Sequence, residues 1–494
     1  MKTLKIYFFA ITMICLGLNT QAQQWKSKEE LKADYELLRT GLETLHGGLY
    51  RYRSESDIKG LFAKHEAIFT NSVNQQEAYL SLAAAMAEIV QCGHTYPNYW
   101  NQTEEVRTTL FSKADKLPFT LKYIENKWVI EHDLSGNQLP KCTEVVAING
   151  TETSDLIAQL MTVFRGDGNN LNQKINDLNL TGQGKFEAVD IYQPMLVAPV
   201  NGSYTISVKQ PGKSTEDINV NATDRETRKQ LLGSWFGVKA TAYDDLWTKR
   251  MIDDKTAYLQ LGTFVTWKME LDWKAFVEGF FQEVQEKEME NVIIDIRGNG
   301  GGTTEVAWYM LKYLTDTKIE VGRYEERMAY AVVPESLKPH LETWESSLFD
   351  LSEKLEQGED SMYYKKRKPK ATRTVRPKEV AFTGNTYLLT DEANSSATFL
   401  MAKAAKESKL ATLVGQSTGG NMKGITGGQM FQLKLPNTGL EVDIPLIGYY
   451  AQNDVPDSGL EPDIAVHNKL SDFMAGEDTV LKAVLADIVS KSKE

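Results

Sequence analysis

Histidine and cysteine are scarce in this sequence, and their spacing excludes the commonest kinds of metal centre. The 494 residues include six histidines and three cysteines. None of them has the CxxC or HxxxH spacing that such centres use on loops and helices. We therefore expect no metal and no cofactor.

Disulfide bonds are equally restricted. If Cys15 is removed with the leader described below, Cys92 and Cys142 are the cysteines that remain. Two cysteines so far apart cannot form the disulfide framework of a small secreted domain. They are either buried thiols or one bridge, and both alternatives stay open.

Positive charge is in the minority. There are 55 lysines and arginines against 67 aspartates and glutamates, which gives a formal net charge of −12. This balance argues against a nucleic-acid partner. One basic run, KKRKPKATRTVRPK at 365–378, contains prolines and follows a charged segment. We interpret it as a solvated loop, with a polyanion contact as the alternative.

The apolar run at the start of the chain is too short for a comfortable membrane span. It reads IYFFAITMICLGL (6–18), follows two lysines and precedes small residues suited to cleavage. This order is typical of a signal peptide, here residues 1–22 with cleavage after Ala22. The residues before Cys15 do not form a lipidation site, so lipoprotein anchoring is disfavoured. The expected location is periplasmic or extracellular.

What the sequence does contain is typical of a large folded protein. Its hydrophobic fraction is 41% and its charged fraction 25%, and its length suggests about three domains of roughly 150 residues each. Residues 23–110 have helical periodicity, and 115–235 read as a β-rich region with at least one helix. Strands and helices alternate over 245–480, which predicts an α/β domain with a charged, partly helical insertion at 322–378.

Several boundaries can be predicted from short local patterns. Ser27, with Glu30 three residues later, is typical of a capping box at a helix start. Tight turns are expected at Glu125-Asn126 and Asn149-Gly150. The segment NVIIDI (291–296) is apolar except for Asp295, which suits a strand buried on both faces.

A pair of serines lies where the predicted strand TYLLT gives way to a helix. The helix buries the face that carries Ala397 and Met401, and Asn394 or Ser395 is a natural N-cap. Ser396 then falls in the first turn, where backbone N–H groups lack helical partners. It is either part of an ordinary cap or a nucleophile with the N–H of Ala397 beside it.

A glycine-rich loop, RGNGGG at 297–302, follows the buried strand. Glycines let the backbone approach a ligand and direct N–H groups toward an anion. A dinucleotide fingerprint would need glycine at position 303, where Thr303 stands. The loop therefore favours an oxyanion or anion site over a nucleotide site.

A serine nucleophile also needs a group that accepts its proton. His94, in CGHTYP at the end of a predicted helix, is the most suggestive histidine, and His46, in LHGGLY, is its competitor. A capping or core role is the alternative for either one.

Taken together, these motifs resemble the C-terminal processing, or tail-specific, serine peptidases. The glycine loop with its strand, the serine segment at 386–420, AYLQLGTF (257–264) and GLEPDIAV (459–466) all resemble segments of that family. LPKCTEVVAINGTETSDLIAQL (139–160) is similar to its PDZ-like segment, though diverged. The resemblance spans about 78–100 and 115–467. It implies an α/β fold with a crotonase-like (ClpP-type) catalytic core, a PDZ-like β-rich domain and an N-terminal helical segment.

The resemblance also implies roles for single residues. The family's nucleophile is followed directly by alanine, which identifies Ser396 and Ala397. The oxyanion donors would be the N–H of Ala397 and that of Gly301 or Gly302.

The tricorn-core and retinoid-binding-protein-like branch carries a G-H-T segment, and its histidine is the base. CGHTYP matches it and indicates His94. That branch also orients its site with an acidic residue near the C-terminal motif, here Asp457 or Asp454.

This sequence departs from the family at three positions. Asn421 follows GQSTGG (415–420), where the Ser–Lys branch has its lysine, and Lys423 is an alternative base two positions later. Cys92 replaces the usual acidic residue before the G-H pair. Phe399 replaces a glutamate three residues after the nucleophile.

The resemblance leads to three functional hypotheses. The first is a secreted or periplasmic serine endopeptidase that hydrolyses peptides or proteins through an acyl-enzyme, with action near protein C-termini. The second is a non-catalytic peptide- or lipid-binding protein on the same scaffold, because fold does not fix function. The third, a crotonase-type acyl-CoA enzyme, is opposed by the signal peptide. No membrane span is expected after cleavage, and the sequence does not predict the oligomeric state.

Overall fold

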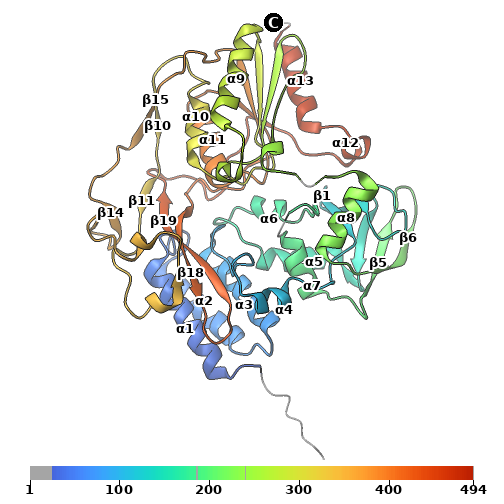
Figure 1. Cartoon of the computed structure of the whole chain (residues 1–494), viewed down its shortest axis with the longest axis vertical. Coiled ribbons are helices and arrows are strands. Elements are labelled where there is room, and N and C mark those ends of the chain that lie inside the picture. Colours follow the sequence, from blue (N-terminus) through green and yellow to red (C-terminus); the bar gives the residue numbers. More distant parts are fainter. Residues whose placement is uncertain (1–24, 185–186, 240, 493–494) are drawn as a thin grey trace, which may run out of the picture.

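The computed structural model describes residues 25–184, 187–239 and 241–492. The predicted signal peptide and Cys15 lie outside these residues. Within the described ranges, no helix is both long enough and apolar enough to cross a membrane. The chain forms a mixed α/β fold with several sheets (Figure 1).

The N-terminal region is helical, as the sequence predicts. Ser27 and Glu30 form the predicted capping box at the start of the first helix. The last of the long helices continues into a five-residue π-helix, η1, which ends at Val90 and is followed by Gln91 and Cys92. The helices are α1 (Lys28–Leu45), α2 (Glu55–Phe69), α3 (Gln75–Ala85), η1 (Met86–Val90) and α4 (Glu104–Leu110).

The β-rich region forms an antiparallel sheet of order β1-β2-β3-β5-β6, with β4 paired to β3. The turn at Glu125-Asn126 is where the sequence predicts it, and both residues have positive φ, 50° and 61°. The strands are β1 (Phe119–Ile124), β2 (Lys127–Asp133), β3 (Glu144–Ile148), β4 (Thr151–Glu152), β5 (Ser203–Lys209) and β6 (Thr215–Asn221). The helices are α5 (Thr153–Val163), α6 (Asn172–Asn176), α7 (Ala188–Leu196) and α8 (Arg225–Phe236).

The alternating region forms a six-stranded sheet of order β20-β17-β16-β9-β8-β7. All neighbours pair in parallel except the edge strand β7. Every residue of β9 is buried, as expected for a strand covered on both faces. The strands are β7 (Trp247–Met251), β8 (Thr256–Leu261), β9 (Asn291–Asp295), β16 (Asn385–Thr390), β17 (Thr412–Gly415) and β20 (Ile464–Ala465).

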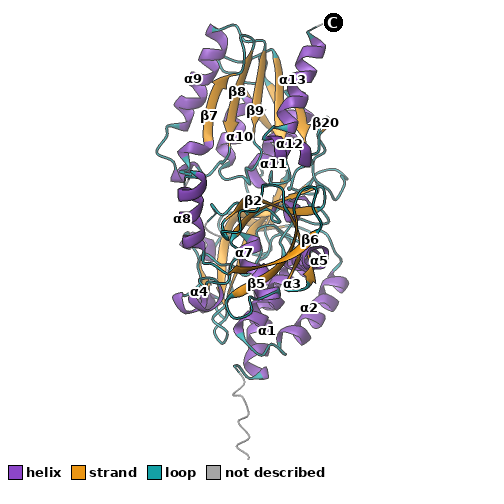
Figure 2. Ribbon diagram, turned by 90° about the vertical axis from the view of Figure 1, so that its right-hand side faces the viewer, coloured by secondary structure: helices purple, strands orange, loops and turns teal. Residues whose placement is uncertain are grey.

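Helices cover this parallel sheet on both faces. α9, α10 and α11 pack on one face and share one hydrophobic cluster with it, whereas α13 packs on the other (Figure 2). The helices are α9 (Trp273–Glu286), α10 (Thr304–Leu311), α11 (Ser396–Glu407), α12 (Leu470–Ala475) and α13 (Thr479–Lys491), with short 3₁₀ turns at η2 (Asp244–Leu246) and η3 (Thr266–Lys268).

The insertion at 322–378 is not partly helical, so that prediction is wrong. All its residues are described, and they form short strands and 3₁₀ turns without an α-helix. The strands at its start pair with longer strands elsewhere, and such pairing overrides local helix propensity. Residues 365–371 of the basic run are exposed, as a solvated loop requires. The elements in and beside the insertion are β10 (Ile319–Gly322), β11 (Glu325–Arg327), η4 (Lys338–His340), β12 (Leu341–Glu342), η5 (Ser346–Phe349), β13 (Leu355–Gln357), β14 (Tyr363–Lys365) and β15 (Thr372–Val375).

A long hairpin, β18 (Thr426–Lys434) and β19 (Glu441–Tyr450), leaves the parallel sheet and reaches the N-terminal helices (Figure 1). A Cβ on Gly41 of α1 would lie 3.0 Å from Leu433 and 3.4 Å from Ile444, so the helix and the hairpin pack closely. The predicted 245–480 region is therefore not one separate unit in space. Its hairpin belongs to the hydrophobic core of the N-terminal half.

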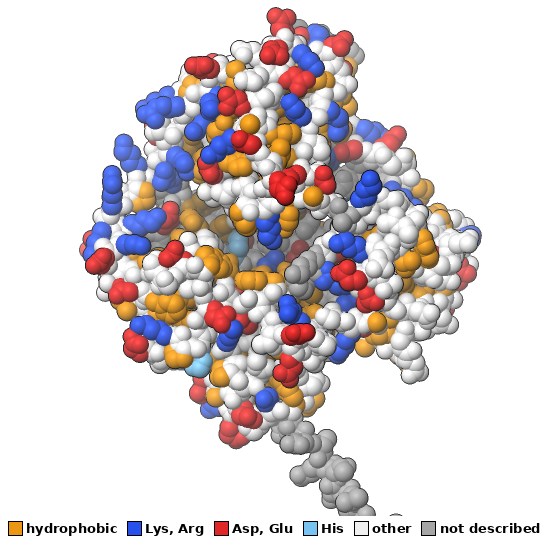
Figure 3. Space-filling view, in the orientation of Figure 1, with side chains coloured by type: hydrophobic (Ala, Val, Ile, Leu, Met, Phe, Trp, Pro, Cys, Tyr) orange, Lys and Arg blue, Asp and Glu red, His pale blue; other side chains and the backbone are white. Residues whose placement is uncertain are grey.

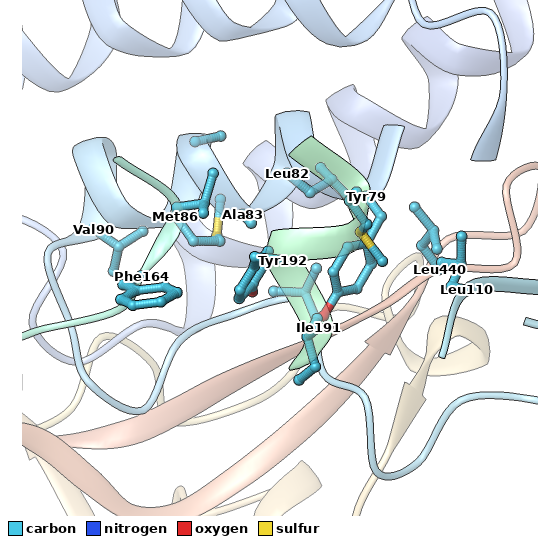
Figure 4. Packing of buried hydrophobic residues seen from close by; sticks show 14 of the residues in the cluster. Tyr79, Leu82, Ala83, Met86, Val90, Leu110, Phe164, Ile191, Tyr192 and Leu440 are labelled. Atoms are coloured by element: carbon cyan, nitrogen blue, oxygen red, sulfur yellow. The ribbon is translucent and has the colours of Figure 1, made fainter. Parts of the chain in front are cut away.

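That larger core fixes the end of the helical region. Figure 4 shows α3, η1 and α7 packed through side chains such as Tyr79, Met86 and Tyr192, with Phe164 beside them. The rings of Tyr79 and Tyr192 stack with centroids 6.0 Å apart. The position of residues 92–95, directly after η1, therefore depends on core packing.

The first prediction concerns the turn of the hairpin. Asp34 of α1 is fully buried and accepts four hydrogen bonds, from the backbone and side chains of Asn437 and Thr438. Asp34→Ala leaves these donors without an acceptor and should cost about 2–4 kcal/mol. The midpoint of thermal unfolding measures the loss.

Asp57→Ala is the matched control, because Asp57 is an exposed first-turn residue of α2 whose carboxylate accepts one hydrogen bond, from Ser54 Oγ. It should cost about 1 kcal/mol or less. Equal losses in the two variants would contradict a special role for Asp34.

Candidate active site

The turn between β16 and α11 places Ser396 in an unusual conformation. Its φ is 50°, in the left-handed region that residues with a Cβ rarely adopt. Such strain persists only where the surroundings hold it, and it is frequent at functional sites. Ser396 Oγ makes no hydrogen bond within the described ranges, and the side chain is partly exposed.

The surroundings that hold this turn come from the glycine loop. Asn394 Nδ2 donates to the carbonyls of Ile296 (2.6 Å) and Asn299 (3.1 Å). Ser395 Oγ donates to the carbonyl of Gly300 (3.0 Å), and Thr398 Oγ1 to that of Asn299 (2.9 Å). Three side chains in the turn around Ser396, which we call the nucleophile turn (394–398), therefore bind the loop that follows β9.

These bonds correct one expectation from the sequence. Ser395 does occupy the N-cap position of α11, but its hydroxyl makes no capping bond to the helix. It binds Gly300 instead. Neither it nor Asn394 acts as the simple cap that the pattern suggested.

The predicted oxyanion donors lie together beside Ser396. A Cβ on Gly301 would be 2.9 Å from Ser396 Cβ and 3.0 Å from Ala397 N, so only glycine fits there. The N–H of Gly301 already donates to Asn299 Oδ1 at 2.8 Å. The N–H groups of Gly302 and Ala397 have no hydrogen-bond partner among the described residues. These two are the available donors.

His94 lies in a different part of the fold, directly after the π-helix. The N–H of the preceding Gly93 donates to Asp167 Oδ1 at 2.9 Å, and Cys92 Sγ approaches the carbonyl of Thr426 at 3.5 Å. Atoms of Cys92, His94 and Asp167 that could bind a metal all lie within 4.8 Å of one another. His94 Nδ1 and Asp167 Oδ2 are buried and have no hydrogen-bond partner in the described part of the chain.

Electrostatics keeps this group of side chains in a state suited to base catalysis. Burial, aided by the nearby positive charge of Arg165, lowers the pKa of His94 to about 4. The imidazole is therefore neutral at pH 7 and can accept a proton. Burial raises the pKa of Cys92 to about 11, so this thiol is not a competing nucleophile at neutral pH. Burial also raises the pKa of Asp167 to about 6.

His46, the competing histidine, has a structural role. Its Nδ1 accepts from the N–H of Gly48 (3.2 Å) and its Nε2 contacts Thr95 Oγ1 (3.0 Å). Burial lowers its pKa to about 3. Both ring nitrogens are occupied, and the ring supports the segment that carries His94.

Asp457 contacts neither His94 nor Ser396 by hydrogen bond in the described structure. Its carboxylate accepts from the N–H (2.9 Å) and the side chain (2.9 Å) of Asn169, and from Asn421 Nδ2 (2.7 Å). Asn421, at the position of the absent lysine, also donates to the carbonyl of Asp167 (2.9 Å). Asp457 therefore braces the loop that carries Asp167, whereas no described hydrogen bond involves the side chains of Asp454 or Lys423.

The segment from 418 to 427 connects the two halves of the site. At one end, the N–H of Gly420 donates to the carbonyl of Asn394 (3.0 Å), beside the nucleophile turn. At the other end, a Cβ on Gly427 would lie 3.7 Å from the His94 ring. No hydrogen bond joins Ser396 to His94 within the described residues, and catalytic hydrogen bonds often tighten only when substrate binds.

A cavity of about 300 Å³ lies near the glycine loop and the segment after His94, although neither Ser396 nor His94 lines it. Gly298 of the glycine loop lines it, as do Tyr96 and Arg165, whose guanidinium carbon lies 4.1 Å from the centre of the Tyr96 ring. Figure 3 shows the surface hollowed between the upper part of the molecule and the parts below it. A substrate could reach the glycine loop and the His94 segment from one space.

Sequence reasoning missed Asp167 and the side chains that hold the loop. Asp167 lies in FRGDGNN, an unremarkable polar stretch far from both motifs in the sequence. Asn394 was visible only as a candidate N-cap, and Thr398 was not singled out. Their partners are backbone carbonyls about a hundred positions earlier, which no local pattern reveals.

The second prediction tests the strained backbone at Ser396. Ser396→Gly should raise the midpoint of thermal unfolding by about 1–3 °C, which corresponds to roughly 1 kcal/mol, because glycine adopts positive φ without a Cβ clash. Ser396→Ala keeps the Cβ and should leave the midpoint almost unchanged.

Ser395→Gly is the control, since Ser395 has an ordinary φ of −128° and binds Gly300. It should lower the midpoint. A lower midpoint for Ser396→Gly as well would show that this position is not strained.

Comparisons with known proteins agree with this arrangement. The family described as peptidase family S41 matches residues 255–466, from β8 to just past β20. Among solved structures, mature CPAF complexed with lactacystin aligns with a TM-score of 0.59 at 14% identity, over 91% of this chain and 95% of that chain. Mature CPAF alone gives 0.59 at 14% identity, over 90% and 94%.

Other comparisons add less. The photosystem II D1 C-terminal processing protease aligns at 13% identity over 88% of this chain and 92% of that chain, but its TM-score of 0.39 carries no argument. No curated protein sequence matches significantly. At 14% identity, the CPAF structures show a common fold only. The match over 255–466 agrees with the resemblance that the sequence motifs predicted: this part of the chain is similar to peptidase family S41, and the chain is a serine-type peptidase.

Proposed function

We propose that this peptidase is exported and cleaves peptide bonds through an acyl-enzyme formed on Ser396. The observation that carries the proposal is the nucleophile turn. Ser396 is held at positive φ beside two N–H groups, those of Ala397 and Gly302, that have no other partner. A serine in that position can attack a carbonyl while both N–H groups stabilise the oxyanion, each donor typically worth about 3–4 kcal/mol.

His94 is the proposed general base. It takes the Ser396 proton during attack and returns it to the leaving amine, and water then hydrolyses the acyl-enzyme with His94 as base again. The ring is neutral at physiological pH, so it has a lone pair that can accept the proton. For the reaction, the His94 segment and the nucleophile turn must approach across the shared cavity, as the substrate closes the gap between them.

Asp167 is proposed as the residue that orients His94. Its free Oδ2 and the free Nδ1 of His94 are both buried, and the two groups belong to one compact cluster. A small side-chain movement would join them in the bond that sets the imidazole tautomer. Asp457, which the sequence motif suggested, supports the site from further away through Asn169 and Asn421.

The wider fold suggests how a substrate is held. We propose a crotonase-like core around the parallel sheet and a PDZ-like role for the β-rich region, which could bind an extended chain by strand addition. Action near protein C-termini follows from the family resemblance. Arg165 lines the cavity and offers a positive charge to a carboxylate there.

The third prediction tests the nucleophile and the base together. A fluorophosphonate should label Ser396 in the purified protein, and mass spectrometry should locate the adduct. Ser396→Ala abolishes labelling, and His94→Gln slows it by about 100-fold or more, the range expected for a lost general base.

Lys423→Ala is the control that should label normally. Labelling that survives in His94→Gln but is lost in Lys423→Ala would move the base to the lysine. Failure of the unmodified protein to label, with peptide binding intact, would favour the non-catalytic binding protein instead.

The fourth prediction separates the two aspartates. Asp167→Asn keeps the shape but removes the charge, and kcat should fall more than about 100-fold with little change in KM, since loss of the equivalent charge in a serine triad is more costly still. Asp457→Asn should reduce kcat less than about tenfold. The reverse order would return the orienting role to Asp457.

A further inference from the structure

Three side chains of different chemistry converge where the helical region meets the β-rich region. They are Cys92 and His94, on the segment after η1, and Asp167, on the loop after α5. One potential ligand atom from each lies within 4.8 Å of the others. Cys92 is 3% exposed and Asp167 is fully buried.

The polar atoms of this cluster are poorly satisfied. His94 Nδ1 and Asp167 Oδ2 are buried without a hydrogen-bond partner. Cys92 Sγ lies 3.5 Å from the carbonyl of Thr426 and 3.4 Å from the backbone nitrogen of His94, and it also contacts the side chain of Thr95. Buried polar atoms without a partner are rare because each one is costly, so two of them in one small space require an explanation.

We propose that Cys92, His94 and Asp167 form a site for a zinc ion that switches the peptidase off. One sulfur, one nitrogen and one oxygen ligand suit Zn²⁺, whereas Mg²⁺ and Ca²⁺ select oxygen alone. Bonds of about 2.0–2.3 Å in a tetrahedral site place ligand atoms roughly 3.3–3.8 Å apart. The cluster therefore needs to contract by about 1 Å, and a water molecule completes the fourth position.

The switch rests on the proposed role of His94 as base. A neutral imidazole has one lone pair available for a proton, on the nitrogen that carries no hydrogen. A zinc ion bound to Nδ1 occupies the lone pair of that nitrogen, and the hydrogen is then on Nε2. A zinc ion bound to Nε2 occupies the lone pair there, and the hydrogen is then on Nδ1. In both cases the ring cannot accept the proton of Ser396.

Zinc binding also removes the partner of the base. As the zinc–sulfur bond forms, the Cys92 thiol gives its proton to solvent, and the Asp167 carboxylate turns from His94 to the metal. The ion would reach the two buried ligands past the partly exposed imidazole. Cys92 occupies the position at which the family it resembles usually has an acidic residue. The sulfur ligand is therefore particular to this chain.

Binding is tested without reference to activity. The full chain carries Cys15→Ser, so that Cys92 and Cys142 are its only thiols, and is titrated with Co²⁺. We expect one equivalent to produce a thiolate-to-cobalt charge-transfer band that Zn²⁺ abolishes by displacement. The band should persist in Cys142→Ser and disappear in Cys92→Ser and Cys92→Ala.

The affinity for zinc should fall more than about 100-fold in the Cys92 variants, beyond the range typical for the loss of an outer-shell partner. Asp167→Asn should also weaken it. No band in the parent chain, or a band that survives without Cys92 but depends on Cys142, would overturn the site.

Inhibition is tested separately, by the rate of fluorophosphonate labelling during a zinc titration. Zinc should stop labelling in the parent chain and in Cys142→Ser, and a chelator should restore it. Relative to its own metal-free rate, Cys92→Ser should need more than about 100-fold more zinc for half inhibition.

The outcomes distinguish the two proposals. If zinc binds through Cys92 but labelling continues unchanged, the switch is overturned and so is His94 as base. If the parent chain never labels, the catalytic proposal fails, whereas the cobalt band still decides whether the metal site exists.

Discussion

The candidate site depends on the hydrogen bonds that hold the nucleophile turn against the glycine loop. Asn394, Ser395 and Thr398 donate side-chain hydrogen bonds to backbone carbonyls of residues 296–300. They keep Ser396 at a positive φ that it would not adopt alone. The same contacts bring Gly301 close to Ser396 Cβ and Ala397 N. The positive φ of Ser396 and the position of the neighbouring N–H groups therefore depend on the same hydrogen bonds.

A second constraint is the hairpin β18–β19, which joins regions that are far apart in sequence. Its first residues lie against His94, its far end packs on α1, and the segment before it binds the carbonyl of Asn394. The His94 segment and the Ser396 turn are thus attached to the same stretch of chain.

The sequence predicted the parts of the fold that local patterns determine. The capping box at Ser27, the turn at Glu125-Asn126 and the buried strand before the glycine loop all form as expected. The insertion was mistaken for partly helical, because its short strands gain their stability from pairing with strands such as β19. Pairing over more than a hundred residues leaves no periodicity that a single sequence shows.

The site was predictable to a similar degree. Ser396, Ala397 and the glycines were predicted because the strand–helix turn and the tight loop resemble family motifs, and the structure brings Ser396, Ala397 and Gly301 together. Asp167 was not, because a carboxylate acts through its position in space, and FRGDGNN has no motif around it. Asp457 was chosen by analogy, and the structure gives it bonds to Asn169 and Asn421 in place of His94.

The central claim is that Ser396 attacks the substrate while the N–H groups of Ala397 and Gly302 bind the resulting oxyanion. In the same step, His94 accepts the proton of Ser396 Oγ. A crystal structure of the phosphonylated enzyme tests this most directly. The account predicts a phosphoryl oxygen about 2.7–3.1 Å from the N–H nitrogens of both residues, and a His94 ring nitrogen within hydrogen-bond reach of Ser396 Oγ. An oxygen bound elsewhere, or Lys423 in the place of His94, would contradict it.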